Sequence, residues 1–444
     1  MKLLLINSPL YREHTETDEE YLPPLGLYYI ATHLKKANIE VEVVDCVEER
    51  LGVDEIFKLL VNRKPDYFAL NIFTQNLETV REIAEKCPVR TTLIIGGQVV
   101  KSIFSEIMTW SISNNLIIII GESELILPEI IKGTCEQQPF YCDETKKVYR
   151  VENTSSYFPS DLDKVCLDRA FLKDRRLINH YGEREVAVIT SRGCTYDCAF
   201  CGAARSKNCD TTIRLRSYID VKNEITAITS THPDVSSIRI LDDLFLRDIK
   251  SINAAIKLFS GFPQISWRGM AHILTFVKTR DLLPLLHESN CRELFVGVES
   301  GSNHIRERIN KSGTTRQVVE TITEILKTGI DVKAYLMFGF PNETKSEANE
   351  TYALAKKLKT VSEMTEGNFR VSVFQFRPYH GTTLYDELIE NGVGIGATRQ
   401  NESLNIFERR LQFNFYSGNY SRMSDEDLNK FVLQTQQLTE ETNA

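Results

Sequence analysis

Short apolar runs alternate with amphipathic segments along residues 1–133. The runs have the length of buried strands and lie at 2–6, 40–44, 67–72, 92–95 and 116–120. A helix is predicted between the first two runs, because a proline is followed by apolar residues at helical spacing: Pro24, Leu27, Ile30, Ala31 and Leu34. Strands that alternate with helices in this way predict an α/β fold with a doubly wound, Rossmann-like parallel sheet.

The alternation resumes at residue 184 with a longer period. Strands are expected at 186–191, 237–242, 265–269, 293–298, 332–338 and 371–376. Helices are expected between them, for example at 315–328, where Val318, Ile322 and Ile325 share one face. These strand–helix units fit a partial (βα)6 barrel, in which chemistry takes place at the carboxyl ends of the strands.

The patterns divide the chain into four parts. A Rossmann-like domain occupies residues 1–133, and a polar, turn-rich linker follows at 134–183. The partial barrel is expected at 184–392. The remaining residues, 393–444, form a C-terminal extension that either closes over the substrate opening or packs as a helical cap.

Composition narrows the classes of partner. The apolar fraction of 42% and the charged fraction of 26% are ordinary for a globular protein. A net charge of −8 gives no general attraction to nucleic acid or acidic membranes, so neither is expected as a partner. The apolar stretch near residue 116 is too short to cross a bilayer, and the apolar run at the N-terminus is too brief for a signal peptide. We therefore expect a cytoplasmic protein.

Three cysteines lie close together, at Cys194, Cys198 and Cys201, whereas the others of the ten are scattered. Soft thiolates bind iron–sulfur clusters, zinc or copper(I). A structural zinc ion would normally use a second short cysteine or histidine pair, which the sequence lacks. A disulfide is not expected in a cytoplasmic chain. Three ligands therefore favour a 4Fe–4S cube with one iron left open for an outside molecule.

The segment around these cysteines, Arg-Gly-Cys-Thr-Tyr-Asp-Cys-Ala-Phe-Cys-Gly, resembles the radical S-adenosylmethionine (SAM) enzymes. In that family the open iron chelates SAM, and a flavodoxin- or ferredoxin-like reductant drives SAM cleavage to a 5′-deoxyadenosyl radical. The resemblance implies that the three cysteines hold the cluster. Phe200 resembles the family's aromatic residue that shields the cluster near the adenine; its other reading is that it only packs the loop.

Residues 1–133 resemble the cobalamin-binding domain that precedes many radical SAM domains. The likeness rests on Pro-Pro-Leu-Gly-Leu before the first helix and on two strand ends, Gly96-Gly97 and Gly121-Glu122. It implies that these four residues contact cobalamin, since doubly wound folds bind ligands at such ends. The motif Asp-x-His-x-x-Gly, whose histidine binds cobalt, is absent, and the corresponding turn begins at Asp45. Either the cobalt lacks this histidine, or the domain has kept the fold and lost the cofactor.

The resemblance assigns SAM contacts to other strand ends of the barrel. Asp243, or its neighbour Asp242, would orient the SAM ammonium; the alternative is that the aspartate caps the following helix. Glu299 would accept hydrogen bonds from the ribose hydroxyls, and Lys311 would pair with the SAM carboxylate. The alternative for Glu299 and Lys311 is a purely structural ion pair, because a buried glutamate needs a partner in any case.

The remaining motifs are less regular. Phe340 lies in Gly-Phe-Pro-Asn-Glu-Thr, which resembles a family turn that flanks the adenine. Asn342 stands there in place of the usual glycine, and asparagine tolerates the left-handed conformation that the turn needs. His380 replaces a usual proline after the last strand. Arg268 and His272, near the end of the third barrel strand, face either the substrate or the surface.

The paired domains imply an enzyme that methylates a carbon atom of a small metabolite in a biosynthetic pathway, with methylcobalamin as the methyl donor. A second reading keeps the radical and omits methyl transfer, giving a rearrangement, cyclisation or dehydration with or without bound cobalamin. A third reading, from a different class, is a binding or electron-transfer protein whose cluster is structural.

Overall fold

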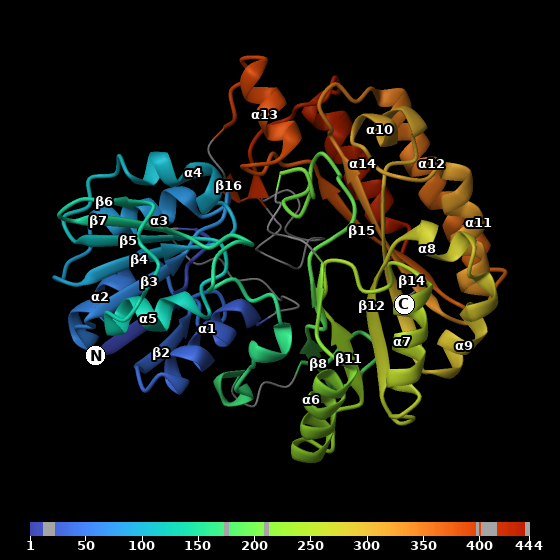
Figure 1. Cartoon of the computed structure of the whole chain (residues 1–444). Helices are drawn as coiled ribbons and strands as arrows, with labels where there is room; N and C mark the ends of the chain where they lie inside the picture. The colour runs from blue at the N-terminus through green and yellow to red at the C-terminus, as the bar shows by residue number, and fades with distance from the viewer. Residues whose placement is uncertain (12–22, 173–176, 208–212, 397–398, 401–414, 440–444) are drawn as a thin grey trace.

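The computed structural model describes residues 1–11, 23–172, 177–207, 213–396, 399–400 and 415–439. Figure 1 shows an N-terminal half, in blue and teal, beside a C-terminal half that runs from green to red. Within these residues, every helix is too short or too polar to span a membrane. The expected fold class, a doubly wound domain followed by a partial barrel, is confirmed.

The N-terminal sheet has seven strands in the order β2-β1-β3-β4-β5-β7-β6, and all neighbours except β6 and β7 are parallel. Its strands are β1 (Lys2–Asn7), β2 (Glu40–Asp45), β3 (Tyr67–Asn71), β4 (Thr92–Gly96), β5 (Asn115–Ile120), β6 (Tyr141–Cys142) and β7 (Lys146–Arg150). All five strands predicted for this half are present, with ends within one or two residues of those expected.

Helices cover both faces of this sheet. One face packs against α2 (Val53–Arg63), α3 (Leu77–Glu85) and α4 (Val100–Ile107). The other packs against α1 (Leu25–Lys36) and α5 (Ile126–Lys132). The predicted helix is α1, which begins directly after Pro24 and buries Leu27, Ala31 and Leu34 against the strands.

The sheet continues past residue 133, into the segment expected to be a linker. The strand β7 pairs with β5, and its consecutive residues Val148 and Tyr149 enter the two opposite cores of the domain. Two apolar residues among lysines and turns are too short a signal to predict a strand from periodicity. After β7 the chain forms the 3-10 helices η1 (Leu162–Lys164) and η2 (Arg169–Leu172) before it reaches the barrel.

The barrel sheet contains six parallel strands in the order β15-β14-β13-β12-β11-β8. Their bounds are β8 (Glu185–Val188), β11 (Ser237–Ile240), β12 (Ser266–Ala271), β13 (Cys291–Glu299), β14 (Asp331–Phe338) and β15 (Phe369–Gln375). Short antiparallel pairs are formed by β9 (Ser191–Arg192) with β10 (Arg214–Leu215), and by β16 (Arg399–Gln400) with β17 (Phe415–Tyr416). The expected single strand at 186–191 is therefore broken after Val188.

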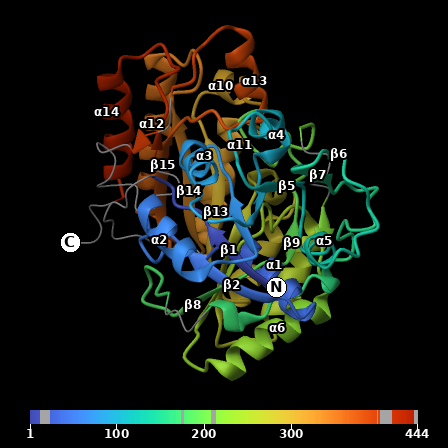
Figure 2. The same ribbon diagram turned by 90° about the vertical axis from the view of Figure 1, so that its left-hand side faces the viewer.

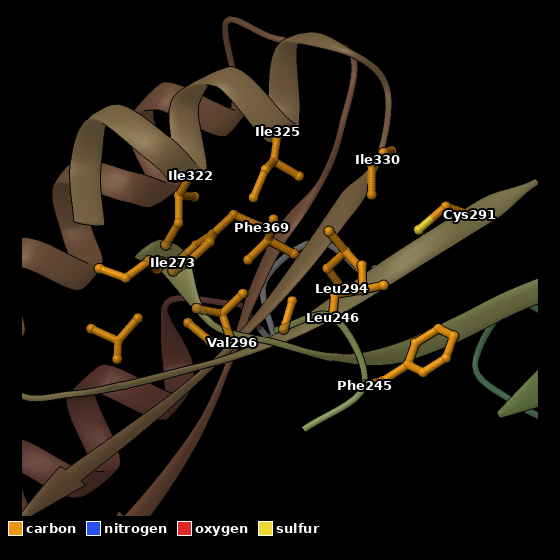
Figure 3. Close-up of a cluster of buried hydrophobic side chains, with 14 of the residues drawn as sticks. Phe245, Leu246, Ile273, Cys291, Leu294, Val296, Ile322, Ile325, Ile330 and Phe369 are labelled. Carbon is orange, nitrogen blue, oxygen red and sulfur yellow. The ribbon is translucent and has the colours of Figure 1, made fainter. Parts of the chain in front are cut away.

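Helices cover the outside of the barrel, as Figures 1 and 2 show. They are α6 (Tyr218–Thr231), α7 (Ile249–Phe259), α8 (Ile273–Val277), α9 (Leu283–Glu288), α11 (Thr315–Lys327), α12 (Lys345–Ser362) and α14 (Asp425–Gln437), with the 3-10 helix η4 (Arg280–Leu282) before α9. Two further helices, α10 (Asn303–Arg308) and α13 (Thr383–Glu390), pack instead with Ala199, Phe340 and Phe376. Figure 3 shows Ile322 and Ile325 of α11 lying over Leu294, Val296 and Phe369 of the strands. The alternate residues of each strand therefore face the inside of the barrel.

The two halves pack through a second face of α1. Leu25, Tyr28 and Tyr29 of this helix form a buried cluster with Val165 and with Ala187 of β8. Since α1 also packs on its own sheet, this helix lies between the N-terminal sheet and the barrel and contacts both. This contact directs the carboxyl end of the N-terminal sheet toward the barrel.

The described part of the C-terminal extension packs as a helical layer. The helix α14 lies against β14, β15 and α12, and the ring of Phe431 stacks on Phe338 with a centroid distance of 5.9 Å. Oε1 of Gln436 accepts a hydrogen bond from the backbone N–H of Val373, so α14 also caps a donor of the edge strand β15. Of the extension expected at 393–444, residues 397–398, 401–414 and 440–444 lie outside the described residues.

Candidate active site

The cysteine loop follows β9 and is anchored by two aspartates at the end of β11. Asp242 is buried and accepts three hydrogen bonds of 2.6 Å, from the backbone N–H and Oγ1 of Thr190 and from Oγ of Ser191. Asp243 accepts a hydrogen bond of 3.1 Å from the backbone N–H of Gly193. The helix-cap alternative for these aspartates is wrong, because the N-cap of α7 is Asp248.

The three cysteine thiols are well shielded from water. Cys198 is 8% exposed, and Cys194 and Cys201 are half-buried. Burial raises the pKa of all three thiols, and that of Cys201 to about 12, so a cationic partner is needed to hold them as thiolates. Lys311 supplies part of that charge, since it acts to lower the pKa of Cys194 and Cys198.

The donor set fits a cluster. Among the described residues, no three or more His, Cys, Asp or Glu side chains are placed to hold a single metal ion. A 4Fe–4S cube asks for a different arrangement, with each thiolate bound to its own iron. Cys194, Cys198 and Cys201 lie on one partly buried loop, and three thiolates with a nearby positive charge from Lys311 are compatible with such a cluster.

Glu299 and Lys311 form an ion pair of 3.0 Å beside this loop, and their side chains are 10% and 8% exposed. Glu299 ends β13 with a left-handed φ of 65°. Gly297 leaves room for the pair, because a Cβ there would lie 2.4 Å from Oε1 of Glu299 and 2.8 Å from Nζ of Lys311. Burial opposes the lysine charge, but Glu299 and Cys198 together raise the pKa of Lys311. The ion pair of Glu299 and Lys311 is thus present, and it lies beside the cysteine loop.

The aromatic candidates form one packed group. Phe200 meets Phe340 edge-on with a centroid distance of 5.9 Å, and Phe340 is fully buried against Phe376. Asn342 has a φ of 62°, so the prediction that asparagine adopts the left-handed conformation of this turn is confirmed. Glu343 holds the turn by accepting a hydrogen bond of 2.5 Å from the backbone N–H of Gly339.

The two weakest candidates of the sequence lie in different places. His272 follows β12 and stacks on Tyr196 of the cysteine loop with a centroid distance of 3.9 Å. Arg268 lies in the middle of β12 rather than near its end, and it is fully buried, so its surface alternative is wrong. Its guanidinium bonds to Glu185 at 2.6 Å and to Glu293 at 2.9 Å. These ion pairs occupy the inside of the barrel near the amino ends of the strands, whereas the cysteine loop follows the carboxyl end of β8.

The buried ion pairs of Arg268 support a stability prediction. Replacing Arg268 with methionine leaves Glu185 and part of Glu293 buried without a counterion, which should lower the free energy of unfolding by about 3 kcal/mol. Urea denaturation measures this loss. The matched control is Arg292→Met on the adjacent strand, whose side chain is exposed and which should change stability by less than ~1 kcal/mol. Equal stability of the two variants would contradict the role of Arg268.

Three loops at the carboxyl end of the N-terminal sheet contact the barrel motifs. After β3, Oγ1 of Thr74 accepts a hydrogen bond from the backbone N–H of His380 at 3.2 Å. After β4, the side chain of Gln98 lies against Gly202, directly after the third cysteine. After β5, Glu122 binds the guanidinium of Arg214 at 2.6 Å and that of Arg192 at 3.1 Å. The carboxyl ends of the two sheets therefore face each other across the cysteine loop.

Of the predicted cobalamin residues, Gly97, Gly121 and Glu122 lie in these loops and Gly96 ends β4. Backbone packing alone explains why two of these positions are glycine. A Cβ at Gly97 would lie 2.5 Å from the carbonyl oxygen of Ile72, and one at Gly121 would lie 2.3 Å from that of Val151. Both glycines have positive φ, of 125° and 97°. They are therefore needed by the chain itself, whereas Gly96 has room beside it. A role in binding cobalamin stays a prediction for all of them.

Sequence reasoning missed the arginines that join the domains. Glu122 was expected only as a cobalamin contact, but its carboxylate is bonded to Arg192 and Arg214, and Arg192 also pairs with Glu124 at 2.7 Å. The available signal was position, since Arg192 stands two residues before the first cysteine. Its two carboxylate partners, Glu122 and Glu124, lie 68 or more residues earlier in the chain. Ion pairs between residues so far apart cannot be inferred from their spacing in the sequence.

We expect Glu122→Gln to weaken the contact between the domains. The loss of a partly buried carboxylate that accepts from two arginines should lower the free energy of unfolding by about 1–3 kcal/mol. Guanidinium denaturation followed by tryptophan fluorescence measures it. Glu152→Gln is the control, because Glu152 makes only a longer pair of 3.7 Å and is 41% exposed. If Glu122→Gln were as stable as this control, the ion pairs would not hold the domains together.

The family model "Radical SAM superfamily" matches residues 188–355, and the model "B12 binding domain" matches residues 15–131. The chain therefore carries a radical SAM domain that is preceded by a B12-binding domain. It is a radical SAM enzyme, and the cofactors of its two domains are a 4Fe–4S cluster with SAM and cobalamin.

Among curated proteins, an uncharacterized methyltransferase of Pyrococcus horikoshii is 26% identical, with 88% of this chain and 84% of the relative aligned. The anaerobic magnesium-protoporphyrin IX monomethyl ester cyclase of Rubrivivax gelatinosus is 23% identical, and this chain spans only 62% of its length. Among solved structures, the radical SAM methyltransferase TsrM from Kitasatospora setae aligns with a TM-score of 0.64 at 15% identity, over 100% of this chain and 89% of that one. The cobalamin-dependent enzyme OxsB aligns with a TM-score of 0.63 at 16% identity, over 97% of this chain and 65% of OxsB. These two structures share the fold.

Proposed function

We propose that this enzyme is a cobalamin-dependent methyltransferase that adds a methyl group to a carbon atom of a small metabolite in a biosynthetic pathway. The observation that carries the proposal is the convergence of two sets of loops. Thr74, Gln98 and Glu122 at the ends of the N-terminal strands all touch residues that flank the cluster and SAM motifs of the barrel. A methyl donor held by one domain would therefore lie beside the radical source held by the other.

Each residue has a task in this proposal. Cys194, Cys198 and Cys201 hold the cluster. Around SAM, Asp243 orients the ammonium, Glu299 accepts from the ribose and Lys311 binds the carboxylate, while the loop of Phe200 and the turn of Phe340 flank the adenine. Gly96, Gly97, Gly121 and Glu122 form the edge toward cobalamin. When bound, the cluster and SAM supply a 5′-deoxyadenosyl radical that takes hydrogen from carbon, and methylcobalamin supplies the methyl group.

The inside of the barrel supports a small substrate. Tyr335 lies between Phe295 and Phe374, with centroid distances of 6.4 and 5.9 Å, and these rings project from three adjacent strands. Below them, the ion pairs of Arg268 fill the amino ends of the strands. This aromatic layer is not fully covered, since Tyr335 and Phe374 are only half-buried. A metabolite of modest size would rest on this layer.

The test is an anaerobic reaction with reconstituted protein, SAM, methylcobalamin with a deuterated methyl group, a low-potential reductant and a small-molecule extract. We expect formation of 5′-deoxyadenosine and a deuterated methyl group in one metabolite, detected by mass spectrometry. A flavodoxin- or ferredoxin-like protein of the cytoplasm is the proposed reductant. Formation of 5′-deoxyadenosine by protein that binds no cobalamin would contradict methyl transfer.

A second function, radical rearrangement or cyclisation without methyl transfer, is favoured by one feature. Asp45 begins the turn that lacks the cobalt-binding histidine, and its carboxylate accepts hydrogen bonds from Nδ2 of Asn7 at 2.8 Å and from the backbone N–H of Val47 at 3.2 Å. The carboxylate thus shapes this turn without a histidine. One relative at 23% identity is named as a cyclase. Cobalt content and transfer of the deuterated methyl group separate the two functions.

A further inference from the structure

His272 is held rigidly at the edge of the cysteine loop. It follows β12 and precedes α8, and its Nδ1 accepts a hydrogen bond from the backbone N–H of Leu274 at 3.2 Å. Nδ1 is therefore the unprotonated nitrogen of the neutral ring, and the proton is on Nε2. The ring stacks nearly parallel on Tyr196, with an angle of 20° between the planes.

The Nε2–H of this ring is a buried donor in need of an acceptor. His272 is 5% exposed, and its Nε2 has no hydrogen-bond partner among the residues that the structure describes. Buried polar groups in folded proteins are almost always hydrogen-bonded. A half-turn of the ring would lose the hydrogen bond from Leu274, and a rotation out of its plane would lose the stack on Tyr196.

Charge identifies the kind of acceptor. Burial, followed by the positive charges of Lys311 and Arg306, lowers the pKa of His272 to about 3, so the ring is neutral and lies within the field of Lys311. Arg306 is occupied by the backbone carbonyls of Ser300, Ser312 and Gly313. Lys311 has Glu299 as its partner, and its charge acts to lower the pKa of the Cys198 thiol. An anion bound to Lys311 in the cysteine loop would therefore also lie near His272.

We propose that Nε2–H of His272 donates a hydrogen bond to the anionic ligand that Lys311 neutralises in the cysteine loop. This inference rests on the proposed function, because it requires that SAM and a cluster bind here. Two anions meet the description, the carboxylate of SAM and a sulfur atom of the cluster. In either case His272 is a cofactor-binding residue, and the substrate contact expected from the sequence is replaced by a contact to the cofactors.

Two variants separate the donor from the other contacts of the ring. His272→Asn keeps a side-chain oxygen that can accept from the N–H of Leu274, but it removes the ring and Nε2–H. His272→Phe keeps the stack on Tyr196 and removes the donor. The control is His287→Asn, because His287 is exposed on α9 and far from the loop in sequence. Iron content is measured first for each reconstituted protein.

The readouts require no methyl transfer. The first is the dissociation constant of SAM, from titration of the reduced cluster followed by electron paramagnetic resonance (EPR). The second is the midpoint potential of the cluster without SAM. If the SAM carboxylate is the acceptor, both variants weaken SAM binding by about 10–100-fold and leave the potential unchanged. If a cluster sulfur is the acceptor, both variants shift the potential to a more negative value and leave SAM binding within twofold.

Unchanged affinity and unchanged potential in both variants would overturn the inference while leaving the proposed function intact. A change in His272→Asn alone would also overturn it, since it would assign the effect to the lost stack rather than to the donor. Wild-type protein that assembles a cluster but binds no SAM overturns the proposed function, and a potential shift in both variants would then still support the cluster contact. Wild-type protein that assembles no cluster would overturn both.

Discussion

Cys198→Ala is expected to abolish assembly of the iron–sulfur cluster and all formation of 5′-deoxyadenosine. Cys198 is the most buried of the three cysteines, and the charges of Lys311 and Glu299 both act on the pKa of its thiol. With two thiolates left, an open-iron cube loses one of its three anchors and becomes exposed to loss of iron. Iron content and the visible absorbance of anaerobically reconstituted protein measure assembly, and liquid chromatography measures 5′-deoxyadenosine.

Cys142→Ala is the matched control, because Cys142 is exposed on the N-terminal sheet. It should retain iron, absorbance and SAM cleavage at the wild-type level. A Cys198→Ala protein that still forms 5′-deoxyadenosine would show that the cluster is not held by this loop.

The second large effect is expected for Lys311→Met. Loss of the ammonium leaves Glu299 buried without its 3.0 Å partner, so the free energy of unfolding should fall by about 3–5 kcal/mol. The proposed contact to the SAM carboxylate is lost as well, which should weaken SAM binding by more than about 100-fold, since hydrogen bonds between charged groups are the strong ones. Urea denaturation and the SAM titration measure the two effects.

The double variant Lys311→Met/Glu299→Gln separates the structural role from the ligand-binding role. Removing both charges relieves the buried carboxylate, so stability should return toward the wild-type value while SAM binding stays weak. Recovery of SAM binding together with stability would mean that Glu299 and Lys311 serve only as a structural ion pair.

The regular elements of this protein could be predicted because their signals are local. The strands β1 to β5, the six barrel strands and α11 appear in the sequence as apolar runs or a 3.6-residue period that matches the side chains now buried. The cysteine loop was also visible, because its three cysteines lie within eight residues of one another. The turn at Asn342 was predicted from its resemblance to a family turn, together with the tolerance of asparagine for the left-handed conformation.

The interactions that the sequence could not supply are between distant residues. Arg268 has the appearance of a site residue on a strand, but only the pairing of β12 with β13 brings Glu293 opposite it. The ion pair of Glu122 with Arg214 depends on how the two domains pack against each other through α1. His272 could be selected from the sequence, but the donor that makes it interesting is visible only once Leu274 and Tyr196 fix its ring.

The central claim is that the carboxyl ends of the two sheets hold cobalamin and the cluster next to each other. EPR spectroscopy of anaerobic protein loaded with Co(II) cobalamin tests it most directly. The account predicts that reduction of the cluster broadens the cobalt signal through magnetic coupling, and that this broadening disappears in Cys198→Ala. A cobalt signal that is the same with oxidised and reduced clusters, or a protein that retains no cobalamin, would contradict it.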